Sequence, residues 1–138
     1  MARFLKPIRP MHSTPRFTIN RHLVILVPRQ PALDWVNSVD PEPPGVTLDE
    51  LREDQNAFLV PDIMDGQEDA QRWVQRRWAM FFESFLVEWY LDPSLWPQKR
   101  SAAMFKKWFD VQYHSMVWDL AAGEPLGYED WDVPEDEQ

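Results

Sequence analysis

The 138-residue chain contains no cysteine and only four glycines, and each shortage excludes or disfavours a class of site. Without cysteine there is no disulfide, no thiolate metal ligand and no cysteine nucleophile. So few glycines disfavour the glycine-rich loops that cradle phosphate groups. No uninterrupted apolar run is longer than that of residues 23–27, which is far short of the roughly 20 residues of a membrane-spanning helix. We therefore expect a cytoplasmic protein without a membrane span, because a reducing compartment suits a chain free of cysteine.

Histidine is also scarce, and the acidic residues do not form a recognisable metal loop. His12, His22 and His114 have no second ligand at the spacing of three or four residues that a metal site favours. Residues 62–69 (DIMDGQED) superficially resemble a calcium loop, but Met64 stands where an oxygen ligand is needed, and Gly66 comes one place early. A turn followed by acids at a helix N-terminus accounts for the same residues. The sequence thus predicts no metal and no other cofactor.

The net charge of −9 conceals four blocks of alternating sign. Residues 1–30 contain six bases and no acid, and residues 31–71 contain eleven acids and one base. Residues 72–108 contain seven bases and three acids, and residues 109–138 contain nine acids and no base. Such blocks can pair within one fold or present opposite faces to partners. Because the overall sign disfavours nucleic acid and anionic membranes, we expect the partner to be another protein.

The distribution of apolar and proline-containing segments predicts one α+β domain between two flexible ends. Residues 1–20 contain three prolines and no periodicity, which indicates a flexible basic arm. Residues 123–138 are acidic and contain proline and glycine, which indicates a flexible tail. Residues 21–122 should form a small, partly antiparallel three-stranded sheet with helices packed on one face.

Local patterns place the shorter elements of this domain. Apolar runs predict strands at residues 22–27, buried on both faces, and at residues 56–60. Alternation over residues 110–120 favours a third strand, with a helix as the alternative. Pro31 fits the first position of a helix that ends before the loop at residues 39–45. Thr47 and Glu50 form the capping box of a short second helix.

The strongest helical pattern covers residues 67–90. Apolar side chains recur there at spacings of three and four and make one broad stripe, with charged residues outside it. We expect Trp78, Phe82 and Phe85 in this stripe to be almost wholly buried. A further helix is predicted over about residues 98–109.

His114 is the candidate for a catalytic residue. It lies between Tyr113 and Ser115 and is close in sequence to Asp110 and Asp119, so an acid–base role is conceivable. A partly buried, hydrogen-bonded structural histidine accounts for the same pattern, and this is the interpretation we prefer.

Arg72, Arg76 and Arg77 begin a basic patch within the predicted domain. Together with the neighbouring tryptophans, they resemble the combination of stacking and charge that binds single-stranded nucleic acid. The interpretation we prefer places the tryptophans in the core and the bases on the solvated opposite face of the helix. We call the predicted exposed surface of these three residues with Lys99 and Arg100 the arginine face.

Tyr128 and Trp131 lie among the acids of the C-terminal tail. Aromatic residues spaced among acids resemble a linear motif that docks on a basic, apolar groove of another protein. The same segment could fold back onto the arginine face of its own chain, and we prefer this self-docking interpretation.

Two stretches, QPALDWVNS (residues 30–38) and FDVQYHSMVWDL (residues 109–120), are similar to small conserved bacterial proteins of unassigned function. The resemblance covers about residues 21–120. It implies a bacterial cytoplasm, and it implies no activity and no site residues.

The leading functional hypothesis is a non-catalytic protein–protein interaction or regulatory domain that acts through Tyr128 and Trp131 or through another aromatic surface. One alternative is a small enzyme or ligand-binding domain that uses His114 with nearby carboxylates. Another is a nucleic-acid partner that binds through the basic arm and the arginine face.

Overall fold

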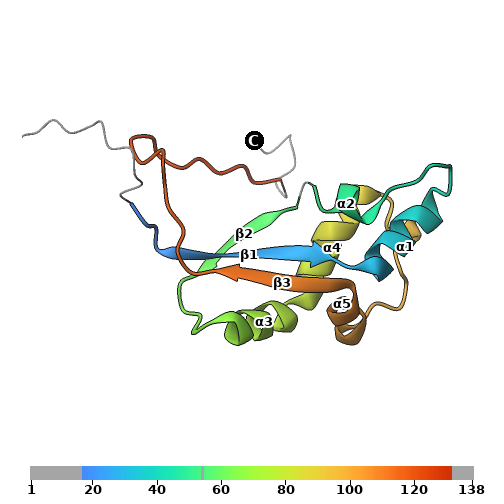
Figure 1. Cartoon of the computed structure of the whole chain (residues 1–138), viewed down its shortest axis with the longest axis horizontal. Helices are drawn as coiled ribbons and strands as arrows, with labels where there is room; N and C mark the ends of the chain where they lie inside the picture. The colour runs from blue at the N-terminus through green and yellow to red at the C-terminus, as the bar shows by residue number, and fades with distance from the viewer. Residues whose placement is uncertain (1–16, 54, 132–138) are drawn as a thin grey trace, which may run out of the picture. The chain divides into compact units, whose positions relative to one another are not determined.

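The computed structural model describes residues 17–53 and 55–131, which form an α+β fold (Figure 1). The predicted fold class and the three-stranded sheet are confirmed, and every strand pair of this sheet is antiparallel. The elements are, in order, β1 (Arg21–Pro28), α1 (Gln30–Val39), α2 (Leu48–Leu51), β2 (Ala57–Pro61), α3 (Gln67–Arg76), α4 (Trp78–Trp89), the 3-10 helix η1 (Pro93–Leu95), α5 (Ala102–Trp108) and β3 (Phe109–His114).

β1 is the central strand of the sheet, whose order is β2–β1–β3. The register pairs Leu23 of β1 with Leu59 of β2 on one side and with His114 of β3 on the other. The first strand of the domain therefore pairs both with a strand from the middle of the chain and with the last strand.

The two faces of β1 are buried to different extents. Val24, Leu26 and Pro28 are buried on the face that the helices cover. The prediction that this strand is buried on both faces is wrong, because the helices gather on one side of the sheet. The second face, which we call the open face, carries the half-buried side chains of Leu23, Ile25 and Val27.

The capping box predicted for the second helix is present. The amide of Glu50 donates to Oγ1 of Thr47 at 3.2 Å, and the amide of Thr47 donates to Oε1 of Glu50 at 2.9 Å. These two bonds satisfy amide groups that the first turn of a helix leaves without a backbone partner. α1 likewise ends at Val39, where the prolines of the following loop predict its end.

The long helix predicted for residues 67–90 is two helices that meet at Arg77. The amide of Arg77 donates to the carbonyl of Val74 at 2.9 Å, so the chain turns more tightly there than an α-helix. Nη1 of Arg77 donates to the carbonyl of Trp73 at 3.0 Å, which an α-helical amide would otherwise bond. The side chain thus satisfies the backbone group that the break would leave unpaired.

The core is aromatic, as the composition indicates, but not all of the expected side chains are deeply buried. Phe82 is fully buried, and its ring centroid lies 5.0 Å from that of Trp108. Trp78 and Phe85 are only half-buried at the margin of the core, which corrects their predicted burial. Ala70 and Val74 of α3 and Phe82 of α4 nevertheless belong to one core, so both helices face it on either side of the break at Arg77.

The third strand forms as the alternation favoured, but it is shorter than expected. β3 covers Phe109–His114, and α5 begins four residues later than predicted, at Ala102. Ser101 provides the N-cap of α5, since its hydroxyl accepts from the amide of Met104 at 3.1 Å.

The described residues divide into two compact units, one within residues 20–117 and the other made of residues 17–19 and 118–131. In the second unit Thr18 pairs with Trp118 in an antiparallel bridge, and the amide of Asp119 donates to the carbonyl of Phe17 at 2.8 Å. Most of the predicted basic arm (residues 1–20) and the last part of the predicted tail lie outside the described residues. The end of the arm that is described pairs with the segment that follows residue 117.

Candidate interaction sites

His114 lies at the end of β3, exposed on the open face of the sheet. Asp110 is on the same face of β3, but four residues at about 3.3 Å each separate the two Cα atoms by about 13 Å. Acid–base partners act within hydrogen-bonding distance, so Asp110 does not contact His114 directly.

The partly buried, hydrogen-bonded histidine is His22 rather than His114. Nδ1 of His22 lies 2.7 Å from the hydroxyl of Tyr113, and the two rings meet edge to face with centroids 5.5 Å apart. Burial raises the pKa of Tyr113, and nearby Asp69 and Asp65 raise it further. No sequence pattern predicts this pair, because 91 positions separate its members and only the sheet register brings them together.

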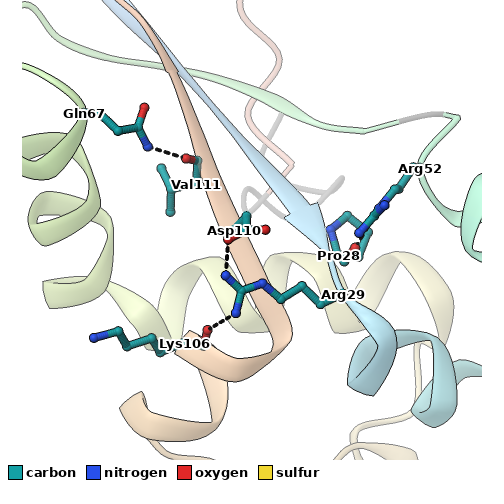
Figure 2. A network of polar contacts seen from close by, with 7 residues as sticks. All are labelled: Pro28, Arg29, Arg52, Gln67, Lys106, Asp110 and Val111. Atoms are coloured by element: carbon teal, nitrogen blue, oxygen red, sulfur yellow. Dashed lines mark hydrogen bonds and ion pairs between the residues drawn. The ribbon is translucent and has the colours of Figure 1, made fainter.

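A polar network joins the end of β1 to the start of β3 (Figure 2). The guanidinium of Arg29 forms an ion pair with Asp110 and donates to the carbonyl of Lys106 at 3.4 Å. The backbone amide of Arg29 also donates to the carbonyl of Trp108, at 2.7 Å. The hydrogen bond from Arg29 holds the pKa of Asp110 below its ordinary value, and the charges of Arg29 and Arg52 act in the same direction.

A cavity of about 420 Å³ adjoins this network. Its lining combines Arg29, Arg72 and Lys106 with the carboxylates of Glu68 and Asp110. Three bases and two acids therefore line it, and the set has little preference for a ligand of either sign.

The predicted arginine face is partly engaged within its own helices. Arg72 lies 3.5 Å from Asp69 in an ion pair one turn away. The guanidinium of Arg77 stacks on Trp73, with its central carbon 3.8 Å from the ring centroid. Arg76 is exposed at the end of α3.

Tyr128 and Trp131 are among the most exposed large side chains of the described residues, with 85% and 83% of their surface accessible. Nε1 of Trp131 donates to a carboxylate oxygen of Glu129 at 2.9 Å, so an acid next to the ring satisfies its polar atom. Leu126 is also exposed. We call residues 124–131 the acidic aromatic segment. Its docking onto the arginine face stays a prediction.

A second hollow, of about 480 Å³, lies between α2, the start of β2 and α4. We call it the α2–α4 groove. Its apolar lining includes Leu26, Leu51, Phe58, Phe85 and Trp89. Sequence reasoning missed this groove, because these residues belong to four elements and share no motif.

In the described part of the chain, no three histidine or acidic side chains gather closely enough to hold a metal ion. Among the helices of residues 17–53 and 55–131, none combines the length and apolar character needed to cross a membrane.

Comparison of the chain with protein-family models, with curated proteins and with solved structures gave no match. The candidate sites are therefore judged on their geometry.

Proposed function

We propose that this is a non-catalytic, cytoplasmic protein–protein interaction protein, which presents its acidic aromatic segment to another protein. The exposure of Tyr128 and Trp131 carries this proposal. Burying a large aromatic side chain is strongly favourable, and such side chains are frequent hot spots where proteins bind one another. Two of them at 85% and 83% exposure in one short segment are available to a partner.

The sequence around the two rings indicates the chemistry of that partner. Glu124, Glu129 and Asp130 surround them, and no base interrupts residues 124–131. A groove with apolar pockets and a basic rim would accept the rings and attract the carboxylates. Association through such charges should be fast and sensitive to salt.

The two alternative functions have weaker geometric support. His114 has no carboxylate within hydrogen-bonding reach along its own strand. Arg72 and Arg77, which a nucleic acid would need to contact, already interact with Asp69 and Trp73.

The test compares three immobilised proteins in a bacterial extract: the wild type, the double variant Tyr128→Ala/Trp131→Ala, and Leu91→Ala. Leu91 is 83% exposed outside the segment and controls for the loss of an apolar surface. We expect the wild type and Leu91→Ala to retain a protein from the extract that the double variant does not retain. A higher salt concentration should release this protein from both.

A direct measurement then uses the purified partner. We expect the indole signal of Trp131, assigned by a Trp131→Phe variant, to shift when that protein is titrated into the full chain. A partner that binds the double variant and the wild type equally would contradict the proposal.

A further inference from the structure

The α2–α4 groove differs from the cavity beside Arg29 in having acids and apolar walls without a basic residue. Its lining residues carry two formal charges, those of Glu50 and Glu88, and both are negative. Leu51, Phe85 and Trp89 together provide apolar surface in the same lining. Its volume of about 480 Å³ falls in the range typical of sites for small organic ligands.

Each of the two carboxylates is held in place by one neutral hydrogen bond. Oε1 of Glu50 accepts from the amide of Thr47 in the capping box, at 2.9 Å. Oε2 of Glu88 accepts from the side-chain amide of Asn56. These donors orient the carboxylates but do not neutralise them, so both contribute negative charge to the groove.

The basic residue that follows α2 is Arg52, which is not among the residues that line the groove. Its Nε donates at 2.9 Å to the carbonyl of Pro28, a groove residue, so its charge lies beside the groove but is engaged with a backbone acceptor. The ion pairs of the described residues involve neither Glu50 nor Glu88. A ligand would therefore meet an apolar surface beside two carboxylates that have no ion-pair partner.

We infer that the α2–α4 groove binds a small organic ammonium ion with an apolar body. The apolar part packs against Phe85, Trp89 and Leu51, and the ammonium group donates hydrogen bonds to Glu88 and Glu50. The charge of the groove favours a cation over a neutral or anionic molecule of the same shape. Aromatic walls add to this preference, because a ring face attracts a cation. None of the residues that line the groove belongs to the acidic aromatic segment, so the inference does not depend on the proposed function.

The test titrates the full-length protein with three compounds of similar shape and follows its ¹H–¹⁵N NMR spectrum. The compounds are phenethylammonium, the neutral 2-phenylethanol and the anionic 3-phenylpropanoate. We expect phenethylammonium to shift the amide signals of Leu51 and Phe58 and the indole signal of Trp89 with saturation. The alcohol should bind about two- to fivefold more weakly, as expected for the loss of an exposed charge pair, and the carboxylate more weakly still.

A matched pair of variants separates the local charge from the overall charge. Glu88→Gln removes the charge but keeps an oxygen that can accept from Asn56. It should lower the affinity for phenethylammonium about two- to fivefold and leave the affinity for 2-phenylethanol unchanged. Glu42→Gln removes the same charge from an exposed loop residue outside the groove and should leave both affinities unchanged.

Three results would overturn the inference. One is the absence of shifts at the groove residues with phenethylammonium, and another is equal affinity for the ammonium, the alcohol and the carboxylate. The third is tighter binding of a blocked lysine, N-acetyl-lysine methylamide, which would indicate a basic side chain of a protein as the occupant. None of these results bears on the binding of a partner to Tyr128 and Trp131, so the two proposals fail independently.

Discussion

Several partly buried aromatic side chains donate hydrogen bonds to backbone carbonyls. The hydroxyl of Tyr90 donates to the carbonyl of Val36 at 2.8 Å, and Nε1 of Trp35 donates to the carbonyl of Leu95 at 3.1 Å. Nε1 of Trp96 donates to the carbonyl of Tyr90 at 2.8 Å. Burial raises the pKa of Tyr90, and the charge of Asp40 raises it further. Trp35 and Tyr90 thus connect α1 with the segment after α4 through directional bonds as well as through packing, and the bond of Trp96 lies within that segment.

Replacing Phe82 by alanine should lower the free energy of unfolding by about 3–5 kcal/mol, because a fully buried ring leaves both lost contacts and a cavity. Phe82 has 0% of its surface exposed and contacts the rings of Phe105, Trp108 and Phe109. Urea denaturation of the wild type and variant provides the measurement. Met80→Ala, at an exposed position of the same helix, is the control and should change the value by less than about 0.5 kcal/mol. A loss of less than about 1 kcal/mol at Phe82 would show that the packing of α4 differs from that described.

The ion pair between Arg29 and Asp110 should give the stability a small dependence on acid. The pKa of Asp110 is lower in the folded state than in the unfolded state, where it is about 3.9. The ionised carboxylate therefore stabilises the fold fully at pH values above the unfolded-state pKa. This contribution is lost as the pH falls through the lower folded-state pKa. Because the side chain is 53% exposed, we expect Asp110→Asn to cost less than about 1 kcal/mol at neutral pH. The difference from the wild type should shrink below about pH 4.

Urea denaturation over a series of pH values measures this difference. In an Arg29→Gln background the effect of the additional change Asp110→Asn should depend less on pH, since the hydrogen bond and charge of Arg29 are gone and only Arg52 still lowers the pKa of Asp110. A difference between the wild type and Asp110→Asn that stays constant from neutral to acidic pH would contradict the assignment.

At the level of the elements, strong local signals in the sequence predicted the right structure. Thr47 and Glu50 marked the start of α2, Pro31 lies in the first turn of α1, and alternation indicated β3. Each of these cues involves residues a few positions apart, so their physical effect does not depend on the rest of the fold.

The break between α3 and α4 could not be predicted, since neither glycine nor proline marks it. It depends on the Arg77 side chain, which bonds the carbonyl of Trp73 and stacks on its ring. An apolar stripe with spacings of three and four continues across the break, because both helices face the core. Periodicity therefore identified the helical conformation correctly but not the number of helices.

The candidate sites were predictable only where they lie in one continuous segment. Tyr128 and Trp131 stand out in the sequence because aromatics among acids are unusual, and both are exposed. The α2–α4 groove and the pair of His22 with Tyr113 depend on the sheet register and on helix packing. Those features arise from the whole fold, and no short pattern encodes them.

For the whole molecule, removal of residues 124–138 should leave the fold of residues 20–117 intact. Residues 20–117 form a compact unit of their own, and the core side chains described above belong to that unit. The deletion removes seven acids and no base, which changes the net charge from −9 to −2. We expect similar far-UV circular dichroism, a similar melting temperature and longer retention on heparin at low salt.

The control for this deletion is the same heparin column at high salt, where the difference between the two proteins should vanish. A large fall in the melting temperature would show that the tail contributes to the core. Unchanged retention at low salt would show that the remaining bases do not form an accessible patch.

The position of β1 at the centre of the sheet also governs when the protein can fold during its synthesis. The ribosome makes β1 first, but Leu23 must pair with His114, the last residue of β3. β2 can pair with β1 earlier, yet a two-stranded hairpin alone is only marginally stable in water. The nascent chain therefore carries the run LVILV incompletely covered until β3 has emerged, and apolar segments of this kind promote aggregation. Folding of this domain is thus complete only after β3 has emerged, and the unpaired β1 is the segment that a chaperone bound to the nascent chain would protect.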